Sequence, residues 1–128
     1  MSLTTPPHSI DAERWVLGSL LIDKDGIIHV ANLLSRDDFY DPAHSIVYEA
    51  ILDLYSRNRP IDSITVREVI DDQKKLESIG WNIFLAGLME AVFTSANIFQ
   101  YAQIVKNKSI LRKLIRAGNE IIMNGYDE

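Results

Sequence analysis

The 128-residue chain contains no cysteine, which excludes disulfides, zinc–thiolate sites and thiol catalysis. No uncharged apolar run approaches the roughly eighteen residues that a membrane span needs, and the first residues do not resemble a signal peptide. None of the six glycines is followed by lysine, and the chain has no Gly-x-Gly-x-x-Gly or Gly-x-Ser-x-Gly pattern. Phosphate-binding loops and nucleophile elbows depend on these residues, so we expect this chain to be neither a motor nor an enzyme.

What the chain does contain is enough apolar sequence for one folded domain: 47% of its residues are hydrophobic and 24% are charged. The net charge of −5 argues against a protein whose whole surface binds nucleic acid. The charge is unevenly distributed, because residues 1–56 carry a net −6 and residues 101–128 a net +2. The C-terminal quarter therefore presents a different kind of surface from the rest.

The basic residues of that quarter fall between positions 101 and 118, where there is no acid. This basic face consists of Lys106, Lys108, Arg112, Lys113 and Arg116. It has three interpretations: a solvated helix face, a docking surface for an acidic protein, or a nucleic-acid contact. The overall negative charge disfavours the third.

Apolar residues recur at helical spacing along nearly the whole chain, and no segment alternates as a strand would. Pro6-Pro7 predicts an extended lead-in over residues 1–8. Ser9 is a predicted N-cap, and Asp11 and Glu13 lie in the first turn near the positive end of the helix dipole. Further helices are predicted to begin near Ile27, Asp41-Pro42, Thr65 and Gly80, with a Thr65–Glu68 capping box at the third of these.

A last helix of about thirty residues is predicted from a cap at Thr94 or Ser95, long against a mean of about twelve. The predicted fold class is therefore all-α: a compact multi-helix head over residues 9–93, followed by one long helix over 94–128. That helix carries a stripe of apolar and glycine residues spaced three or four apart, typical of a surface that packs against another helix. The stripe includes Leu111, Leu114, Gly118, Ile121 and Gly125.

Two groups of residues have both a structural and a functional interpretation. Asp37, Asp38, Asp41 and His44 cluster in sequence, and a metal or acid–base site is conceivable. Capping explains the acids better, because Ser35, Asp38 and Asp41 stand where helices begin. The two tryptophans, Trp15 and Trp81, are expected in the core, Trp15 at the edge of its helix's buried face.

The chain resembles the N-terminal domain of the bacterial replicative DNA helicase, the DnaB family, over nearly all of residues 6–126. The resemblance begins with Pro6-Pro7-His8-Ser9-Ile10-Asp11-Ala12-Glu13 and continues through Asp38-Phe39-Tyr40 and Pro60-Ile61-Asp62. It ends with Tyr101-Ala102-Gln103-Ile104-Val105 and Leu111-Arg112-Lys113-Leu114-Ile115. The ordered set of these motifs at matching spacing is specific, although no single motif is.

The resemblance implies a helical head followed by a helical hairpin, with paired domains forming a collar above a hexameric ATPase ring. It implies docking of the C-terminal domain of primase at the positions Phe84, Ile115 and Ile121. It places the pairing interface at Leu111, Leu114, Gly118 and Ile122. The domain itself is expected to be non-catalytic and without cofactors, and ATP and magnesium to belong to a motor beyond residue 128. We expect a cytoplasmic protein of the replisome, without membrane contact and with at most minor DNA contact.

The chain departs from the family pattern at Trp81, where a second glycine usually follows Gly80, and at Phe93, where proline is frequent. We interpret Met1-Ser2-Leu3 as a remnant of recombinant expression and residues 94–128 as the first arm of a truncated hairpin. Two alternatives remain open at this point: the helicase-binding C-terminal domain of a primase, and a small helical nucleic-acid-binding domain that uses the basic face.

Overall fold

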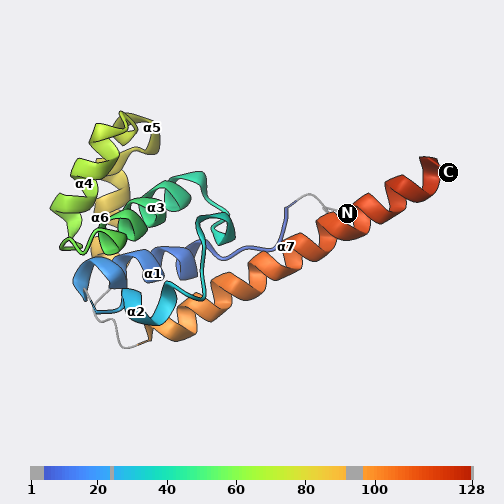
Figure 1. The fold of residues 1–128 in the computed structure, drawn as a ribbon, viewed down its shortest axis with the longest axis horizontal. Coiled ribbons are helices and arrows are strands. Elements are labelled where there is room, and N and C mark those ends of the chain that lie inside the picture. The colour runs from blue at the N-terminus through green and yellow to red at the C-terminus, as the bar shows by residue number, and fades with distance from the viewer. Residues whose placement is uncertain (1–4, 24, 92–96, 128) are drawn as a thin grey trace.

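The computed structural model describes residues 5–23, 25–91 and 97–127, and in these ranges every regular element is helical. The elements are α1 (Ile10–Ile22), α2 (Ile27–Val30), the 3-10 turn η1 (Arg36–Asp38), α3 (Pro42–Ser56), α4 (Ser63–Asp72), α5 (Leu76–Ile79), α6 (Trp81–Ala91) and α7 (Ile98–Asp127). Helices α1 to α6 form a head, and α7 passes along it and then projects far beyond it (Figure 1). The predicted all-α fold, a head followed by one long helix, is confirmed.

Several helices begin where the sequence predicts. Ser9 caps α1, with its Oγ accepting a hydrogen bond from the Ala12 N–H at 3.2 Å. Asp41 caps α3 by accepting from the Ala43 N–H at 2.9 Å, and Pro42 occupies the first helical position. Ser35 and Asp38 form a capping box around η1. The capping interpretation of these acids is therefore confirmed.

The predicted capping box at Thr65–Glu68 is wrong, because the box lies three residues earlier. The Asp62 carboxylate accepts from the backbone N–H groups of Ile64 and Thr65, and the Thr65 hydroxyl lies 2.9 Å from the Asp62 N–H that it accepts. Asp62 offers a carboxylate one turn before Thr65, so the helix begins there. Thr65 takes the reciprocal place in the box instead of the cap.

Two features between α4 and α6 separate the helices. Lys74, two residues after the end of α4, has a left-handed backbone with a φ of 58°. Gly80, directly after α5, has a φ of 64°. Glycine is suited to this left-handed conformation because it has no Cβ. Gly80 thus ends α5 rather than opening the next helix, and α6 begins directly at Trp81. Phe93, Thr94 and Ser95 lie outside the described residues.

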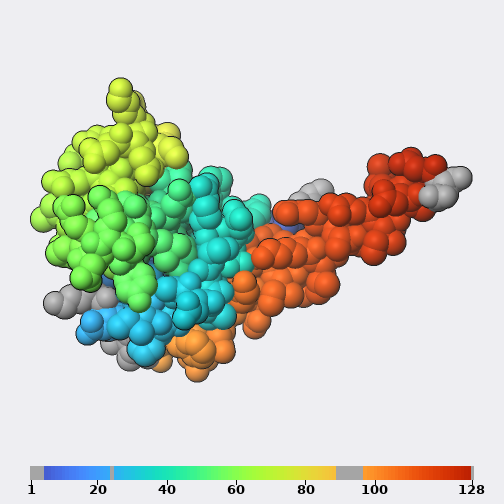
Figure 2. All heavy atoms as spheres, viewed as in Figure 1, coloured from blue at the N-terminus to red at the C-terminus, as the bar shows by residue number. Residues whose placement is uncertain are grey.

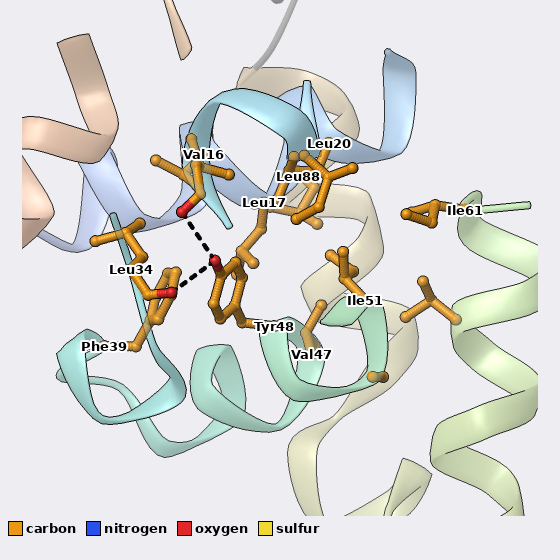
Figure 3. Close-up of a cluster of buried hydrophobic side chains, with 14 of the residues drawn as sticks. Val16, Leu17, Leu20, Leu34, Phe39, Val47, Tyr48, Ile51, Ile61 and Leu88 are labelled. Atoms are coloured by element: carbon orange, nitrogen blue, oxygen red, sulfur yellow. Dashed lines mark hydrogen bonds between the residues drawn. The ribbon is translucent and has the colours of Figure 1, made fainter. Parts of the chain in front are cut away.

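The core of the head surrounds Tyr48, whose side chain is fully buried on α3 (Figure 3). Its hydroxyl donates to the backbone carbonyls of Val30 and Leu34, at 3.3 and 3.0 Å. Burial raises the pKa of Tyr48, with a smaller contribution from the charge of Asp38, so the hydroxyl remains a donor. Apolar side chains from α1, α3, α4 and α6 belong to the same buried cluster, among them Val16, Leu17, Leu20, Ile51 and Leu88.

The two tryptophans occupy different depths of this core. Trp81 at the start of α6 is only 5% exposed. Trp15 on α1 is half-buried and its ring packs on Tyr101 of α7, with ring centroids 4.7 Å apart. Both positions agree with the sequence prediction, including the edge position of Trp15. In the described part of the chain, no helix is long and apolar enough to span a membrane.

Candidate protein-interaction surfaces

Helix α7 is docked to the head through its first half. The buried residues of α7 are Ile98, Ala102, Val105 and Ser109, which repeat every three or four positions and so share one face. That face packs against α1, α2 and η1. Beyond Ser109, Arg112 and Lys113 still bind the head, and the C-terminal part of the helix then stands clear of it (Figure 2). The arm, defined as residues 110–127, is therefore presented for contacts outside this head.

The junction between head and α7 is organised around the fully buried carboxylate of Asp38. One oxygen accepts from the Ser35 N–H at 2.7 Å, and the other accepts from the Ser109 hydroxyl at 2.7 Å. The ammonium groups of Lys106 and Lys113 lie 3.4 and 3.5 Å from the same carboxylate. A residue of the capping box around η1 is thus also the polar anchor of the long helix.

The electrostatic surroundings of Asp38 favour its charged form. Burial by itself would raise the pKa of this carboxyl group. The hydrogen bonds from Ser35 and Ser109 and the positive charges of Lys106 and Lys113 outweigh that effect and hold the pKa below its ordinary value. The buried charge is therefore compensated by the residues that it joins.

Arg112 ties the lead-in to the same junction. Its guanidinium donates to the carbonyl of Pro7 at 2.8 Å and to the carbonyl of Asp38 at 2.7 Å. It also lies over the ring of Tyr40, 5.6 Å from the centroid, and the ring of His8 stacks on the same Tyr40 at 4.1 Å. The lead-in consequently runs beside α7, as Figure 1 shows, rather than away from it.

These contacts change the interpretation of the basic face. Lys106, Arg112 and Lys113 bind groups of the head, a structural role that none of the three sequence-based interpretations included. Lys108 and Arg116 form no hydrogen bond or ion pair within the described part of the chain. These five residues therefore do not form a continuous basic surface that could bind nucleic acid.

A second buried carboxylate, Glu13, connects α1 to the start of α3. It is 1% exposed and accepts from the N–H groups of Tyr40 at 2.7 Å and Asp41 at 3.3 Å. The Nδ1 atom of His44 lies 2.8 Å from the same side chain. From the sequence, Glu13 is predicted only to lie in the first turn of its helix, near the positive end of the helix dipole. Its spacing of three, four and seven residues before buried Val16, Leu17 and Leu20 is the signal that it shares their face.

The predicted cluster of Asp37, Asp38, Asp41 and His44 is dispersed among different tasks. Asp37 is exposed, Asp38 anchors α7, Asp41 caps α3 and His44 pairs with Glu13. No three His, Asp or Glu side chains in the described ranges converge in a group that could hold a metal ion. Asp38, Asp41 and His44 therefore act in helix capping and packing.

The predicted pairing stripe lies on the arm without cover. Leu111, Leu114 and Ile122 are 44%, 62% and 56% exposed. A Cβ placed on Gly118 would meet no atom within 4 Å, so the space beside this glycine is open. A contiguous apolar surface of this kind on a projecting helix is typical of an interface between proteins. We call these four residues the pairing stripe.

The three candidate primase-docking residues do not meet within one chain. Phe84 is half-buried on α6, against the rings of His44 and Trp81 at 5.5 and 5.9 Å. Ile115 and Ile121 are 51% and 71% exposed on the arm. Six helical residues separate the two isoleucines, which places them roughly 120° apart around α7. A partner that contacts all three has to bridge the head and the arm, or two different copies.

The chain folds as an all-helical domain with candidate interaction surfaces. The first half of its long helix packs on the head, and the second half projects from it. The chain belongs to the DnaB-like helicase N-terminal domain family, whose pattern matches residues 5–107. It is 45% identical over 121 residues to the replicative DNA helicase DnaB of Mycobacterium leprae and 40% identical to that of Geobacillus stearothermophilus. Each match covers 94% of this chain but only 20% and 27% of the two relatives, so the chain spans a fraction of their length.

Two solved structures share the fold. The N-terminal domain of DnaB helicase from Mycobacterium tuberculosis is 44% identical with a TM-score of 0.92, covering 97% of this chain and 88% of that one. The N-terminal domain of DnaB helicase from Helicobacter pylori, described together with its interactions with primase, is 28% identical with a TM-score of 0.77. That match covers 91% of this chain and 90% of the other. The family favours the helicase over the primase alternative, since it is the helicase domain that matches.

Proposed function

We propose that this domain is the non-catalytic collar element of a hexameric replicative DNA helicase. It pairs with a second copy through the pairing stripe and docks the C-terminal domain of a primase. The observation that carries the proposal is the uncovered apolar face of the arm, with Leu114 62% and Ile121 71% exposed. Exposing such a row of apolar side chains to water is unfavourable in free energy unless a partner covers it.

The rest of the parent protein supplies the chemistry in this proposal. ATP and magnesium act in a motor domain that the relatives' greater length leaves room for. The domain itself contributes contacts, and its own contact with DNA is minor because three of the five basic-face residues bind the head. The assembly works in the cytoplasm as part of the replisome.

Pairing is tested by Leu114→Ala. Truncation removes an apolar side chain from the centre of the pairing stripe, and we expect self-association to weaken roughly tenfold, as is common for a central interface residue. Sedimentation velocity over a concentration series measures the change. Ile64→Ala, a substitution of an isoleucine that is 70% exposed on α4, is the control and should associate as the wild type does. Equal association of Leu114→Ala and wild type would remove the stripe from the interface.

Primase docking is tested by titrating the C-terminal domain of a DnaB-family primase into the chain and into Ile115→Ala and Ile121→Ala. We expect each variant to bind about tenfold more weakly by calorimetry, because each loses an exposed apolar contact at the interface. Ile64→Ala again serves as the control, since α4 carries none of the three proposed docking residues. Wild-type affinity in both arm variants would contradict the proposed contact. Ile115 and Ile121 flank the pairing stripe on the helix surface, so the self-association of both variants is measured beside their primase binding.

A further inference from the structure

A hollow of about 720 Å³ lies between the lead-in and the arm. We call it the strap groove. Its apolar surface comes from Pro6 of the lead-in and from Ile115 and Met123 of α7, and its charged residues are Arg112, Arg116 and Glu120. Met123 is 62% exposed, so the groove is open to a ligand.

The strap groove and the pairing stripe face different sides of the same helix. Arg116 and Met123 are two and five residues from Gly118, which places them about 160° and 140° around the helix from it. Ile115, which also lines the groove, is only about 60° from Gly118, so it lies between the two surfaces. A second copy bound to the stripe therefore leaves Arg116 and Met123 accessible. The groove can take a partner of its own.

A polar pocket of about 420 Å³ adjoins the groove on the side of the head. Arg112 and Arg116 line both hollows, and Lys113, Ser35, Ser109 and Asp37 complete the pocket. Arg112 is committed to the carbonyls of Pro7 and Asp38, and Lys113 is 3.5 Å from buried Asp38. Arg116 has no hydrogen bond or ion pair within the described residues, although Glu120 is one turn further along the helix. A guanidinium with no direct hydrogen bond to the described residues therefore stands where the polar and apolar hollows join.

We propose that the strap groove binds an acidic peptide segment of a partner protein, with a carboxylate at Arg116 and a neighbouring apolar side chain against Met123. A guanidinium pairs with a carboxylate through a planar, two-pronged hydrogen-bonding surface. Glu120, one turn beyond Arg116 on the same helix, repels a second acid beside it, which favours a ligand with its acidic residue towards the head. The two residues tested here, Arg116 and Met123, are not among the proposed primase contacts, although Ile115 belongs to both surfaces.

A nucleic-acid strand fits this site less well than a peptide. Binding of a phosphate backbone needs a row of available cations. Here Arg116 is the cation without a partner in the two hollows, Asp37 and Glu120 add negative charge, and the groove floor is apolar. These properties are typical of a protein interface with an apolar centre and a charged rim.

The test uses the 128-residue chain and three fluorescein-labelled probes: a short Asp/Glu- and Leu-containing peptide, the same peptide with Asn/Gln for the acids, and a single-stranded oligonucleotide. We expect fluorescence anisotropy to show binding of the acidic peptide, weakened roughly tenfold in Arg116→Glu, which reverses the charge at an exposed ion pair. Met123→Ser should weaken it several-fold through the loss of apolar contact. Both residues are exposed, so the fold is expected to persist.

Lys108→Glu is the matched control, because it makes the same charge change on the same helix but lies eight residues, about 12 Å, from Arg116. That distance exceeds the screening length at physiological salt, so binding should not change. The proposal is overturned if the acidic peptide does not bind, if it binds both groove variants as it binds wild type, or if the amide peptide binds equally well. Stronger binding of the oligonucleotide, lost in Arg116→Glu, would assign the site to nucleic acid instead. Weaker self-association of Arg116→Glu with no peptide binding would assign it to a second copy.

Discussion

Asp38→Ala is expected to lower the free energy of unfolding by about 3 kcal/mol, the cost of removing one partner from a buried charged network. The substitution leaves the Ser35 N–H and the Ser109 hydroxyl without their acceptor, and both lie at the junction of η1 and α7. Lys106 and Lys113 are 30% and 53% exposed and can regain water, which keeps the loss at the lower end of the range. Chemical denaturation monitored by circular dichroism measures the change in midpoint.

Asp37→Ala is the matched control, since it removes the adjacent but exposed carboxylate. A surface substitution of this kind usually changes stability by no more than about 0.5 kcal/mol. If the two variants unfold at the same denaturant concentration, the network around Asp38 does not hold α7 to the head. A lower free energy of unfolding in Asp38→Ala, but not in Asp37→Ala, would show that the Asp38 carboxylate anchors the long helix.

The same network predicts how stability responds to acid. The folded-state pKa of Asp38 is below its ordinary value, so the folded protein binds the proton less readily than the unfolded chain does. The stabilisation is therefore complete above about pH 4, where unfolded carboxyl groups are charged, and is lost as the pH falls through the lower folded pKa. The Asp38→Ala variant should show a smaller loss of stability between neutral and acidic pH than wild type.

The long helix and its exposed stripe could be predicted from the sequence because both are periodic properties of local sequence. Leu111, Leu114 and Gly118 recur at three- and four-residue spacing, and the structure finds the first two exposed on a projecting helix. The helix N-termini at Ser9 and Asp41 can also be predicted, since an N-cap depends on its own side chain and the next few backbone N–H groups. Thr65 shows the limit: it satisfies the capping pattern, but Asp62 one turn earlier competes for the same role.

The polar anchors could not be predicted because they depend on partners far along the chain. Asp38 meets Ser109 and Lys106 across about seventy residues, and Glu13 meets His44 across thirty-one. Local spacing contains no information about which helix covers which carboxylate. The structural role of the basic face is hidden for the same reason, since the contacts of Lys106 and Arg112 form only when η1 and the lead-in lie beside α7.

Glu13→Ala is expected to destabilise the head by about 3–5 kcal/mol, because the buried His44 ring and two partly buried backbone N–H groups lose their common partner. The Glu13 side chain is 1% exposed and accepts from the N–H groups of Tyr40 and Asp41 while lying 2.8 Å from His44. These contacts fix the segment between η1 and α3, from which Tyr40 packs against Arg112 and His8. Denaturant unfolding gives the loss, and amide hydrogen exchange at Tyr40 and Asp41 should accelerate more than exchange in α4.

Asp11→Ala separates this anchoring role from the helix dipole, because Asp11 lies in the same first turn but is exposed. A charge near the helix N-terminus is worth about 0.3–1 kcal/mol, so Asp11→Ala should cost no more than that. Similar losses in both variants would mean that Glu13 acts only through the dipole. A double-mutant cycle of Glu13→Ala with His44→Ala then measures the interaction energy between these two side chains. A coupling of about 0.5–3 kcal/mol is expected for two residues in one buried network. Additive effects would instead mean that Glu13 stabilises the head through its backbone contacts alone.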